Sequence, residues 1–437
     1  MEGELRQRKG KQEAAGDRGQ EKEARGRGER VDRSFTLGLL LLVSLAGVAG
    51  GLLLLAPSSP PSILLSSCLD LLLSSLLLLP RQHAVVLDAG STGSRVLAFT
   101  FHSHPVTGQL VLEDELWHEV KPGLSSYAEE PARGAESIAS LLALAKARIP
   151  PAAWPGTPAT LMATAGLRLL PHLQSEALLE AVRATMAGSG FEDRGTGIMG
   201  ELEEGVYGWL TVNYLLGELE RPEKSYVALD LGGGSTQITF APREGETLAS
   251  SPANFLHQKT VSSKPVTLYS HSYLGLGLMA AREAVLRTTS PTSPCVRQEV
   301  EFRGLTVVPS PVAGYEVCMV LVQEFLDTQH IHQPKELPER KIAAFSYFHD
   351  RAVDAGLLGE GESGVVRVEQ YLEAADKACS GGGGAGASPF LCLDLTFIAG
   401  LLHHGYRLEA AAKLGLYKQI DGHQTSWALG AAFHLLQ

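Results

Sequence analysis

Two segments far apart in this sequence repeat one pattern, and that repetition constrains the fold more than any other feature. In each, an apolar run rich in β-branched residues ends in Asp and is followed by small residues and a second apolar run: residues 84–90 (AVVLDAG) precede RVLAFTF, and residues 226–234 (YVALDLGGG) precede QITFAP. Such runs predict buried strands, and the small residues between them predict a tight hairpin turn. The sequence therefore predicts two similar lobes, each presenting one glycine-rich loop.

Strand and helix patterns alternate between the two loops. Residues 159–166 (ATLMATAG) have the composition of another buried strand. In LQSEALLEAVRATM, helical periodicity places four apolar residues on one face, namely Leu173, Ala177, Leu178 and Val182. This alternation predicts an α/β fold.

A matched pair of glycine-rich loops favours a phosphate site. Glycine lets backbone N–H groups approach phosphate oxygens closely, and hydroxyl groups add donors. Asp88 and Asp230 end the two strands, where a carboxylate can hold a hard cation such as Mg²⁺ through the waters this ion keeps. A single loop would be better explained as a plain turn, whereas two facing loops predict a clamp for a di- or triphosphate and its metal. No GxxxxGK[ST] segment occurs, so the pattern is not a P-loop.

The charge of the chain argues against a nucleic acid as partner. Lys and Arg number 37 against 48 Asp and Glu, which gives a formal net charge of −11. There is thus no global basic field to hold a nucleic-acid backbone. An anionic small substrate would need local backbone amides or a metal ion to offset the repulsion.

The N-terminal part has the pattern of a membrane anchor. Residues 1–34 are dominated by Gly, Arg, Glu, Lys and Gln and predict a disordered cytosolic tail. Residues 35–56 are uncharged and as a helix would reach about 33 Å, enough for a hydrocarbon layer ~30 Å thick. Arginines precede this stretch, so the positive-inside rule predicts a single-pass type II protein whose remainder is lumenal or extracellular. A cleaved signal peptide, which would leave a secreted protein, is the alternative.

A second leucine-rich stretch, residues 63–79, leaves the topology open. It would reach only about 25 Å as a helix, and it contains Asp70 and several serines. We expect residues 57–83 to form a stalk next to the membrane. If residues 63–79 also crossed the bilayer, the C-terminal part would be cytosolic, and Arg81 would fit that topology.

The five cysteines contain no CxxC motif, which argues against a zinc ribbon or a thioredoxin-type site. Cys68 lies in the leucine-rich stretch and is left for a free thiol or an intermolecular bridge. The other four allow three pairings. Disulfides persist in oxidising compartments, so their formation would favour the lumenal topology.

Five segments together resemble the ectonucleoside triphosphate diphosphohydrolase (apyrase) family of the actin, sugar-kinase and heat-shock chaperone superfamily. They follow the order of that family: DAGSTGSR, ATAGLRLLP, GELEEGVYGWLTVNYLLG, DLGGGSTQ and TSWALGA. The resemblance implies two RNase H-like lobes with a cleft between them. We expect lobe I to comprise residues 84–194 plus 422–437, and lobe II residues 195–421.

The resemblance also implies a catalytic base, Glu204, which stands before Gly205 in LEEGVYGW. Taken alone, a Glu at this place would be explained by its favourable interaction with a helix N-terminus. Glu203 is its neighbour and a competing candidate. Phosphoryl transfer to water requires mainly positioning, charge neutralisation and one group that deprotonates the attacking water.

The remaining roles come from the same resemblance. Ser235 and Gln237 would help to hold the attacking water, and Asp88 and Asp230 would hold Mg²⁺ or Ca²⁺ through its hydration shell. The phosphate-binding residues would be Ser91, Thr92, Gly93, Ser94, Arg95, Thr164, Gly232, Gly233, Gly234 and Ser235.

The number of cysteines and the absence of a second span after TSWALGAAFHLL resemble the single-span, secretory-pathway branch of the family. That branch prefers nucleoside diphosphates such as UDP and GDP to triphosphates, and it implies two disulfides, Cys295–Cys318 and Cys379–Cys392. A Golgi or ER enzyme that clears the diphosphates left by glycosyltransferases is therefore expected.

Three aromatic residues are expected to serve packing. Surface members of the family carry an aromatic for the base after FSAF, but this chain reads FSYFHD, so Tyr347 is interpreted as a core residue. Trp427 and Tyr417 are interpreted as packing between the lobes.

Two other functions stay open from the sequence. A chaperone-like or actin-like protein would use slow hydrolysis to time a shape change, and a kinase of the same superfamily would need an acceptor site. Glu204 favours hydrolysis over both.

Overall fold

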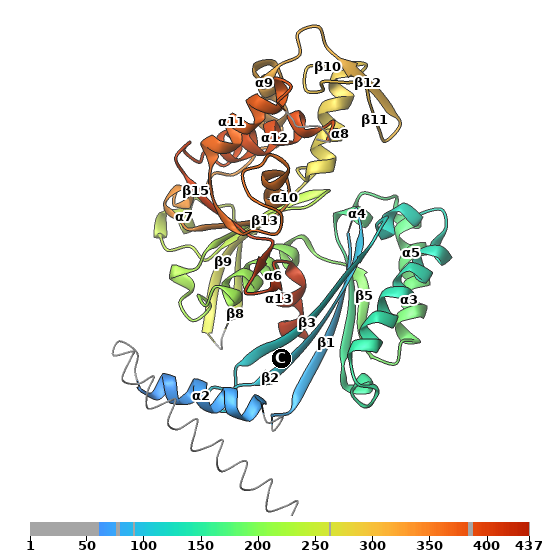
Figure 1. The fold of residues 1–437 in the computed structure, drawn as a ribbon, viewed down its shortest axis with the longest axis vertical. Helices are drawn as coiled ribbons and strands as arrows, with labels where there is room; N and C mark the ends of the chain where they lie inside the picture. The colour runs from blue at the N-terminus through green and yellow to red at the C-terminus, as the bar shows by residue number, and fades with distance from the viewer. Residues whose placement is uncertain (1–60, 76–78, 91, 262–263, 383–387, 437) are drawn as a thin grey trace, which may run out of the picture. The chain divides into compact units, whose positions relative to one another are not determined.

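The computed structural model of the chain describes residues 61–75, 79–90, 92–261, 264–382 and 388–436 (Figure 1). The predicted tail (residues 1–34) and membrane span (residues 35–56) lie outside the described residues, and so does Ser91. Among the described helices, none combines the length and the apolar composition that a membrane span needs. By its internal contacts the chain divides into a small unit, Met1–Arg81 with His102–Val111, and a large unit, Gln82–Phe101 with Leu112–Gln437.

In the small unit, part of the predicted stalk forms helix α2 (Pro61–Ser75). The Asp70 carboxylate is buried and lies 2.9 Å from His102 Nε2. The Ser66 hydroxyl lies 3.2 Å from His104 Nε2. The one acidic side chain of the leucine-rich stretch is therefore paired with a histidine of the same unit.

The first lobe is built on a five-stranded sheet with the order β3-β2-β1-β4-β5. Its strands are β1 (Arg81–Ala89), β2 (Ser94–Ser103), β3 (Leu110–Val120), β4 (Pro158–Ala163) and β5 (Glu192–Ile198). β4 runs parallel to both β1 and β5. The strand that leads into the first glycine-rich loop therefore lies at the centre of the sheet.

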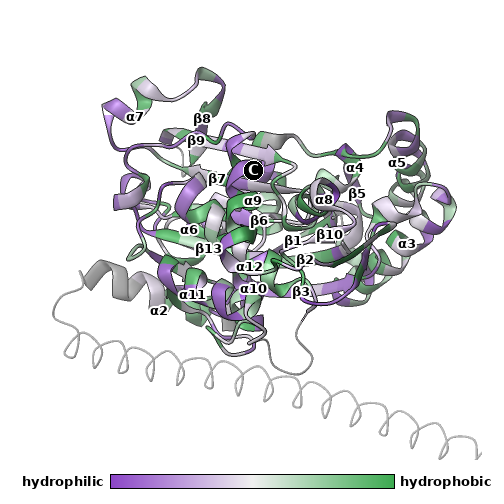
Figure 2. Ribbon diagram, turned by 90° about the horizontal axis from the view of Figure 1, so that it is seen from above, coloured by the Kyte–Doolittle hydropathy of each residue, from purple (hydrophilic) through white to green (hydrophobic). Residues whose placement is uncertain are grey.

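Two long helices, α3 (Pro131–Arg148) and α5 (His172–Ala187), lie side by side against this sheet (Figure 1). In Figure 2, α3 alternates between hydrophobic and hydrophilic colours around its axis, as a helix with one buried face does. The short elements of this lobe are η1 (Leu124–Tyr127), η2 (Pro151–Gly156) and α4 (Ala165–Arg168).

The predicted apolar face of α5 was partly wrong. Leu178 and Val182 are buried, but Ala177 is exposed and Leu173 is 85% exposed. The face that meets the sheet continues instead to Leu179 and Met186. Because Leu173 lies in the first turn, it projects beyond the region that the sheet covers.

The second lobe is built on a seven-stranded sheet with the order β14-β15-β13-β6-β7-β9-β8. Its strands are β6 (Val227–Leu231), β7 (Ser235–Phe240), β8 (Leu256–Val261), β9 (Lys264–Leu274), β13 (Ile342–Ser346), β14 (Gly364–Arg367) and β15 (Lys413–Leu416). β13 runs parallel to β6 and β15, whereas β7 is antiparallel to β6. Every residue of β6 is buried, as expected of a central strand covered on both faces.

Helices cover both faces of the second sheet. One face packs against α6 (Glu201–Leu215), and the other forms the larger core with the helices of the outer layer. These outer helices are α8 (Leu278–Thr289), α9 (Tyr315–Asp327), α10 (Tyr347–Asp354), α11 (Val368–Cys379) and α12 (Leu391–Gly400). The shorter elements are η3 (Pro222–Lys224), α7 (Gly245–Ser250), η4 (Ala253–Phe255), β10 (Thr292–Ser293), β11 (Val300–Phe302), β12 (Leu305–Pro309), η5 (Leu337–Glu339), η6 (Leu401–Gly405), β16 (Gln419–Ile420) and β17 (His423–Gln424).

The two sheets share one plan, which agrees with the repetition in the sequence. The order β3-β2-β1-β4-β5 corresponds to β9-β7-β6-β13-β15, so β1 and β6 occupy equivalent central positions. The predicted boundary between residues 194 and 195 falls inside β5, which continues to Ile198. The last helix, α13 (Trp427–Leu435), packs against α6, and its Phe433 ring lies 5.4 Å from the Phe101 ring of the first sheet.

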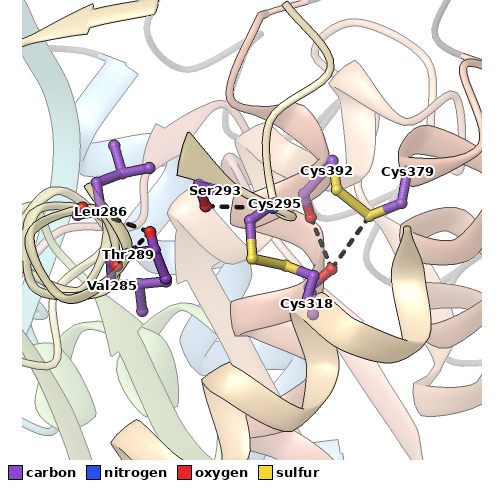
Figure 3. Close-up of a disulfide and its surroundings, with 9 residues drawn as sticks. Val285, Leu286, Thr289, Ser293, Cys295, Cys318, Cys379 and Cys392 are labelled. Atoms are coloured by element: carbon purple, nitrogen blue, oxygen red, sulfur yellow. Dashed lines mark hydrogen bonds between the residues drawn. A yellow bond between two sulfur atoms is a disulfide. The ribbon is translucent and has the colours of Figure 1, made fainter. Parts of the chain in front are cut away.

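Both predicted disulfides are present in the outer layer of the second lobe (Figure 3). Cys295 pairs with Cys318, and Cys379 at the end of α11 pairs with Cys392 in α12. All four cysteines are buried. The first bridge ties the segment after β10 to α9, and the second ties α11 to α12.

Candidate active site

A single cavity of ≈ 360 Å³ brings the two glycine-rich loops together. Its lining includes Asp88 and Gly90 from the first lobe, and Asp230 with the glycines that follow it from the second. The two turns that repeat in the sequence therefore face one shared space inside the large unit.

The first loop supplies Asp88, Gly90 and Thr92 to the cavity. The Arg95 guanidinium donates to Asp88 Oδ2 at 3.1 Å, while Asp88 Oδ1 is buried without a hydrogen-bond partner among the described residues. β4 pairs with β1 so that Ala163 lies opposite Ala89, which places Thr164 beside this loop and in the cavity lining.

Two predicted phosphate ligands of the first loop do not line the cavity. Gly93 and Ser94 are absent from its lining, and the Ser94 hydroxyl accepts a hydrogen bond from Leu124 N–H at 3.0 Å. Ser94 begins β2, so its side chain stabilises the turn that leads into η1. Ser91 lies outside the described residues.

The second loop is held by the N-terminus of α8. Its carbonyl groups at Gly232 and Gly233 accept hydrogen bonds from Leu278 and Met279 N–H, both at 2.9 Å. A Cβ atom at Gly277 would lie 2.3 Å from the Ser235 backbone nitrogen, so only glycine permits this close approach. The predicted residues Gly232, Gly233, Gly234 and Ser235 all line the cavity.

Ser235 and Gln237 form one hydrogen-bonded group. The Gln237 amide donates to the hydroxyls of Ser235 and Ser272, each at 2.8 Å. Gln237 Oε1 is buried without a hydrogen-bond partner among the described residues. Ser235 lines the cavity, whereas Gln237 does not and reaches it through Ser235.

Glu204, in the first turn of α6, lines the same cavity as the loops. It is 6% exposed, and Arg168 donates to its Oε2 at 2.5 Å. The pKa of Glu204 is raised to about 8, mainly by burial; Arg168 opposes this shift, and the charges of Asp230 and Asp88 contribute to it. Glu203 instead accepts a hydrogen bond from Gly200 N–H at the start of the helix, so its side chain caps α6.

The other two carboxyl groups of the cavity are also buried. Burial raises the pKa of Asp88 despite the neighbouring Arg95 guanidinium. Burial raises the pKa of Asp230 to about 6, against a hydrogen bond from Ser346. Asp230 Oδ1, like Asp88 Oδ1, has no hydrogen-bond partner among the described residues. Two buried, unsatisfied carboxylate oxygens fit a hard divalent cation, which takes oxygen ligands.

Several residues that sequence reasoning did not assign complete the lining. Arg168 lies in the ATAGLRLLP segment, but its pairing with Glu204 depends on the fold. Ser346 ends β13 next to Leu231 and has a φ of 57°, a strained conformation of the kind found at functional sites. Trp117 and Glu119 of β3 form part of the rim, together with Lys121, which follows the strand.

The rest of the cavity rim is formed by α10 and by the segments around β16 and β17. Tyr347 packs against the core of the second lobe, as predicted, and it also lines the cavity, with the Arg351 guanidinium 5.5 Å from its ring centre. Asp350 also lines the cavity and accepts from Lys418 at 3.1 Å. Trp427 is buried as predicted, and it lines the cavity as well.

Comparison with known proteins gives consistent matches. Residues 79–437 match the GDA1/CD39 (nucleoside phosphatase) family. Ectonucleoside triphosphate diphosphohydrolase 5 of Bos taurus is 40% identical over 81% of this chain and 88% of its own length. The nucleoside diphosphate phosphatase ENTPD5 of Homo sapiens is 39% identical over 81% of this chain and 87% of its own length. Ectonucleoside triphosphate diphosphohydrolase 6 of Mus musculus is 40% identical over 81% of this chain and 82% of its own length.

Solved structures support the two-lobed fold at low sequence identity. A nucleoside triphosphate hydrolase structure from Neospora caninum covers 81% of this chain and 92% of its own, with a TM-score of 0.56 and 16% identity. A PPX-GPPA enzyme of Aquifex aeolicus covers 82% of this chain and 100% of its own, with a TM-score of 0.50 and 13% identity.

Proposed function

This chain belongs to the GDA1/CD39 (nucleoside phosphatase) family, and from that premise we propose that it hydrolyses nucleoside diphosphates to monophosphate and phosphate with the help of Mg²⁺ or Ca²⁺. The observation that carries the proposal is the meeting of three buried carboxyl groups, Asp88, Glu204 and Asp230, with two glycine-rich loops in one cavity.

The loops and the carboxyl groups have different roles in the reaction. The two loops grip the phosphate chain from opposite lobes, and Asp88 and Asp230 hold the hydrated cation, which neutralises phosphate charge when bound. Ser235, positioned by Gln237, orients the attacking water. Glu204 takes a proton from that water while the water oxygen bonds to the terminal phosphorus. The bond from that phosphorus to the bridging oxygen then breaks, and the nucleoside monophosphate leaves. The positive charge of the bound cation would favour the ionised form of Glu204, which is the form that accepts a proton.

The preference for diphosphates rests on the relatives. One of them carries the name nucleoside diphosphate phosphatase and is 39% identical to this chain. We extend that preference to this chain for UDP and GDP, with weaker hydrolysis of triphosphates. The nucleoside then occupies the rim formed by β3 and α10, where Tyr347 is available for stacking.

We further propose a lumenal location, with one N-terminal span at residues 35–56. The two disulfides support this topology, because such bridges persist in oxidising compartments. Protease treatment of sealed vesicles tests it. Protection of the C-terminal region supports a lumenal domain, and digestion in intact vesicles contradicts it.

Phosphate release from UDP, GDP and ATP, measured with Mg²⁺ or Ca²⁺ and no acceptor alcohol, tests the activity. We expect multiple turnovers, fastest with the diphosphates. Release that occurs only when an alcohol acceptor is added would indicate a kinase. A single slow turnover coupled to a shape change would indicate a chaperone-like protein.

A further inference from the structure

Arg95 is held between two carboxylates from different strands of the first lobe. Its Nη2 donates to Glu119 Oε1 of β3 at 2.6 Å, and its Nη1 donates to Asp88 Oδ2 at 3.1 Å. The side chains of Arg95, Glu119 and Asp88 are 26%, 19% and 11% exposed. All three line the cavity, so this chain of charges forms part of its wall.

The two contacts of Arg95 are unequal. The contact with Glu119 is the shorter one, as expected of a strong charge-assisted hydrogen bond. The contact with Asp88 uses one carboxylate oxygen only, and the second, Oδ1, is buried without a hydrogen-bond partner among the described residues. A guanidinium with no competing acceptor favours a bidentate contact that occupies both oxygens of a carboxylate. The hydrogen bond from Arg95 to Glu119 prevents this bidentate contact with Asp88.

Glu119 is itself confined. Lys121 Nζ lies 3.4 Å from its second carboxylate oxygen. A Cβ atom at Gly93 would lie 2.6 Å from Glu119 Oε1, so a larger residue at position 93 would displace the Glu119 carboxylate. The carboxylate of Glu119 is therefore fixed by a cation on each side and by the backbone of the first loop.

The second lobe has no equivalent of this arrangement. Asp230 forms no ion pair among the described residues, and its hydrogen-bond partner is Ser346. The charge of Arg95 reaches Asp230 and lowers its pKa, but the hydrogen bond of Arg95 goes to Asp88. A carboxylate that restrains an arginine is therefore needed only in the first lobe.

We propose that Glu119 is a positioning residue that keeps one oxygen of Asp88 available to the divalent cation by holding Arg95 away from it. The proposal rests on the proposed function, because that function places the cation at Asp88 and Asp230. Without the Glu119 carboxylate, Arg95 turns fully onto Asp88 and competes with the cation.

Binding of Mn²⁺ in the absence of nucleotide, followed by the electron paramagnetic resonance signal of the free ion, tests the proposal. Partners that orient a metal ligand typically contribute 10–100-fold to metal affinity. We expect Glu119→Ala to raise the Kd for Mn²⁺ about tenfold. Glu119→Gln, which keeps the volume of the side chain, should shift the Kd in the same direction by a smaller factor and replaces the Ala variant if that one does not fold.

The double variant Glu119→Ala/Arg95→Met separates this mechanism from simple loss of negative charge. Removing Arg95 removes the competitor, so the Kd of the double variant should return close to that of Arg95→Met alone. A double variant as weak as Glu119→Ala would show that Glu119 attracts the cation directly and would overturn the proposal. Glu130→Gln, which removes an exposed carboxylate paired with Arg133 outside the cavity, is the matched control and should leave the Kd unchanged.

Mn²⁺ binding by the wild-type protein distinguishes failure of the proposed cation site from failure of the role proposed for Glu119. If it binds no Mn²⁺, the cation site of the proposed function fails. If it binds Mn²⁺ and Glu119→Ala binds equally well, the proposed function stands and the role of Glu119 is refuted.

Discussion

The two glycine-rich loops have the same place in equivalent sheets, yet they are stabilised in different ways. The second loop is fixed through its backbone, because carbonyl groups of Gly232 and Gly233 accept from N–H groups of α8. The first loop depends on charged side chains, with Asp88 and Glu119 on either side of Arg95. The shared strand order explains why both loops reach one cavity. The difference shows that the second lobe offers a rigid cradle, while the first offers a charge balance that ligands can shift.

The largest expected effect tests the two aspartates against each other. Asp230→Asn should lower kcat/KM about 100-fold, because, among the described residues, Asp230 is the one carboxylate that the second loop itself contributes to the cavity. Asp88→Asn should lower it by only about tenfold, since the loss frees Arg95 to contact phosphate. Initial rates with UDP over a range of Mg²⁺ concentrations measure both values. Equal losses would show that the Arg95 pairing does not distinguish the loops.

The next effect concerns the glycines that support each loop. At Gly277, a Cβ atom would meet backbone atoms of Gly234 and Ser235, whereas at Gly93 it would meet the end of the Glu119 side chain. Overpacking against fixed backbone costs about 1–3 kcal/mol, so Gly277→Ala should lower stability and kcat more than Gly93→Ala. Urea denaturation and steady-state kinetics measure the two quantities. A larger loss from Gly93→Ala would contradict the rigid cradle.

Much of this architecture could be predicted from local sequence. The strands, the loops and the two aspartates follow from apolar runs that end in Asp and Gly, and the resemblance to a family added Glu204 and the disulfide pairs. Glu203 and Glu204 are adjacent, but only the structure shows that one caps α6 and the other faces the cavity.

What could not be predicted depends on contacts between distant segments. Arg168 and Glu119 reach their partners only after the lobes have formed, and a basic or acidic residue in a sequence does not reveal its partner. The face of α5 was misjudged because Leu173 fits the helical period but lies beyond the sheet. Tyr347 begins α10, where it packs against the core as predicted and also reaches the cavity, a second role that the sequence did not indicate.

The pH dependence of stability sharpens the comparison further. The pKa of Asp230 is raised to about 6 and that of Glu204 to about 8. A carboxyl group with a raised pKa binds more protons in the folded than in the unfolded protein. The free energy of unfolding therefore falls as pH rises from the pKa of that group in the unfolded protein to its pKa in the folded protein. We expect the Tm of the cation-free protein to fall from pH 4 to pH 8, and Mg²⁺ to raise it most at the upper end.

Variants assign the two parts of this decline. Asp230→Asn should flatten the curve between about pH 4 and pH 6, and Glu204→Gln should flatten it from about pH 4.5 up to about pH 8, so that the decline above pH 6 is assigned to Glu204 rather than to Asp230. Differential scanning fluorimetry in matched buffers gives the curves. A Tm that rises with pH over this range would contradict the burial of ionised carboxylates in the empty cavity.

The smallest expected effect on activity concerns the disulfides, which lie in the second lobe away from the loops. Replacing Cys295 and Cys318 together by Ala should lower the free energy of unfolding by about 2–4 kcal/mol. The kcat at 25 °C should stay at the wild-type value, because neither α9 nor the segment after β10 contributes a described residue to the cavity lining. Chemical denaturation and turnover of the same preparation measure both. A large fall in kcat would show that the outer layer sets the geometry of the cradle.

Hydrolysis by Glu204→Gln tests the central claim most directly. Gln keeps the shape of the side chain and can still accept the hydrogen bond from Arg168, but it cannot take a proton from water. With UDP and Mg²⁺ bound as in the wild-type protein, we expect turnover to fall at least about 100-fold. Turnover equal to that of the wild type would remove Glu204 from the reaction and contradict the account.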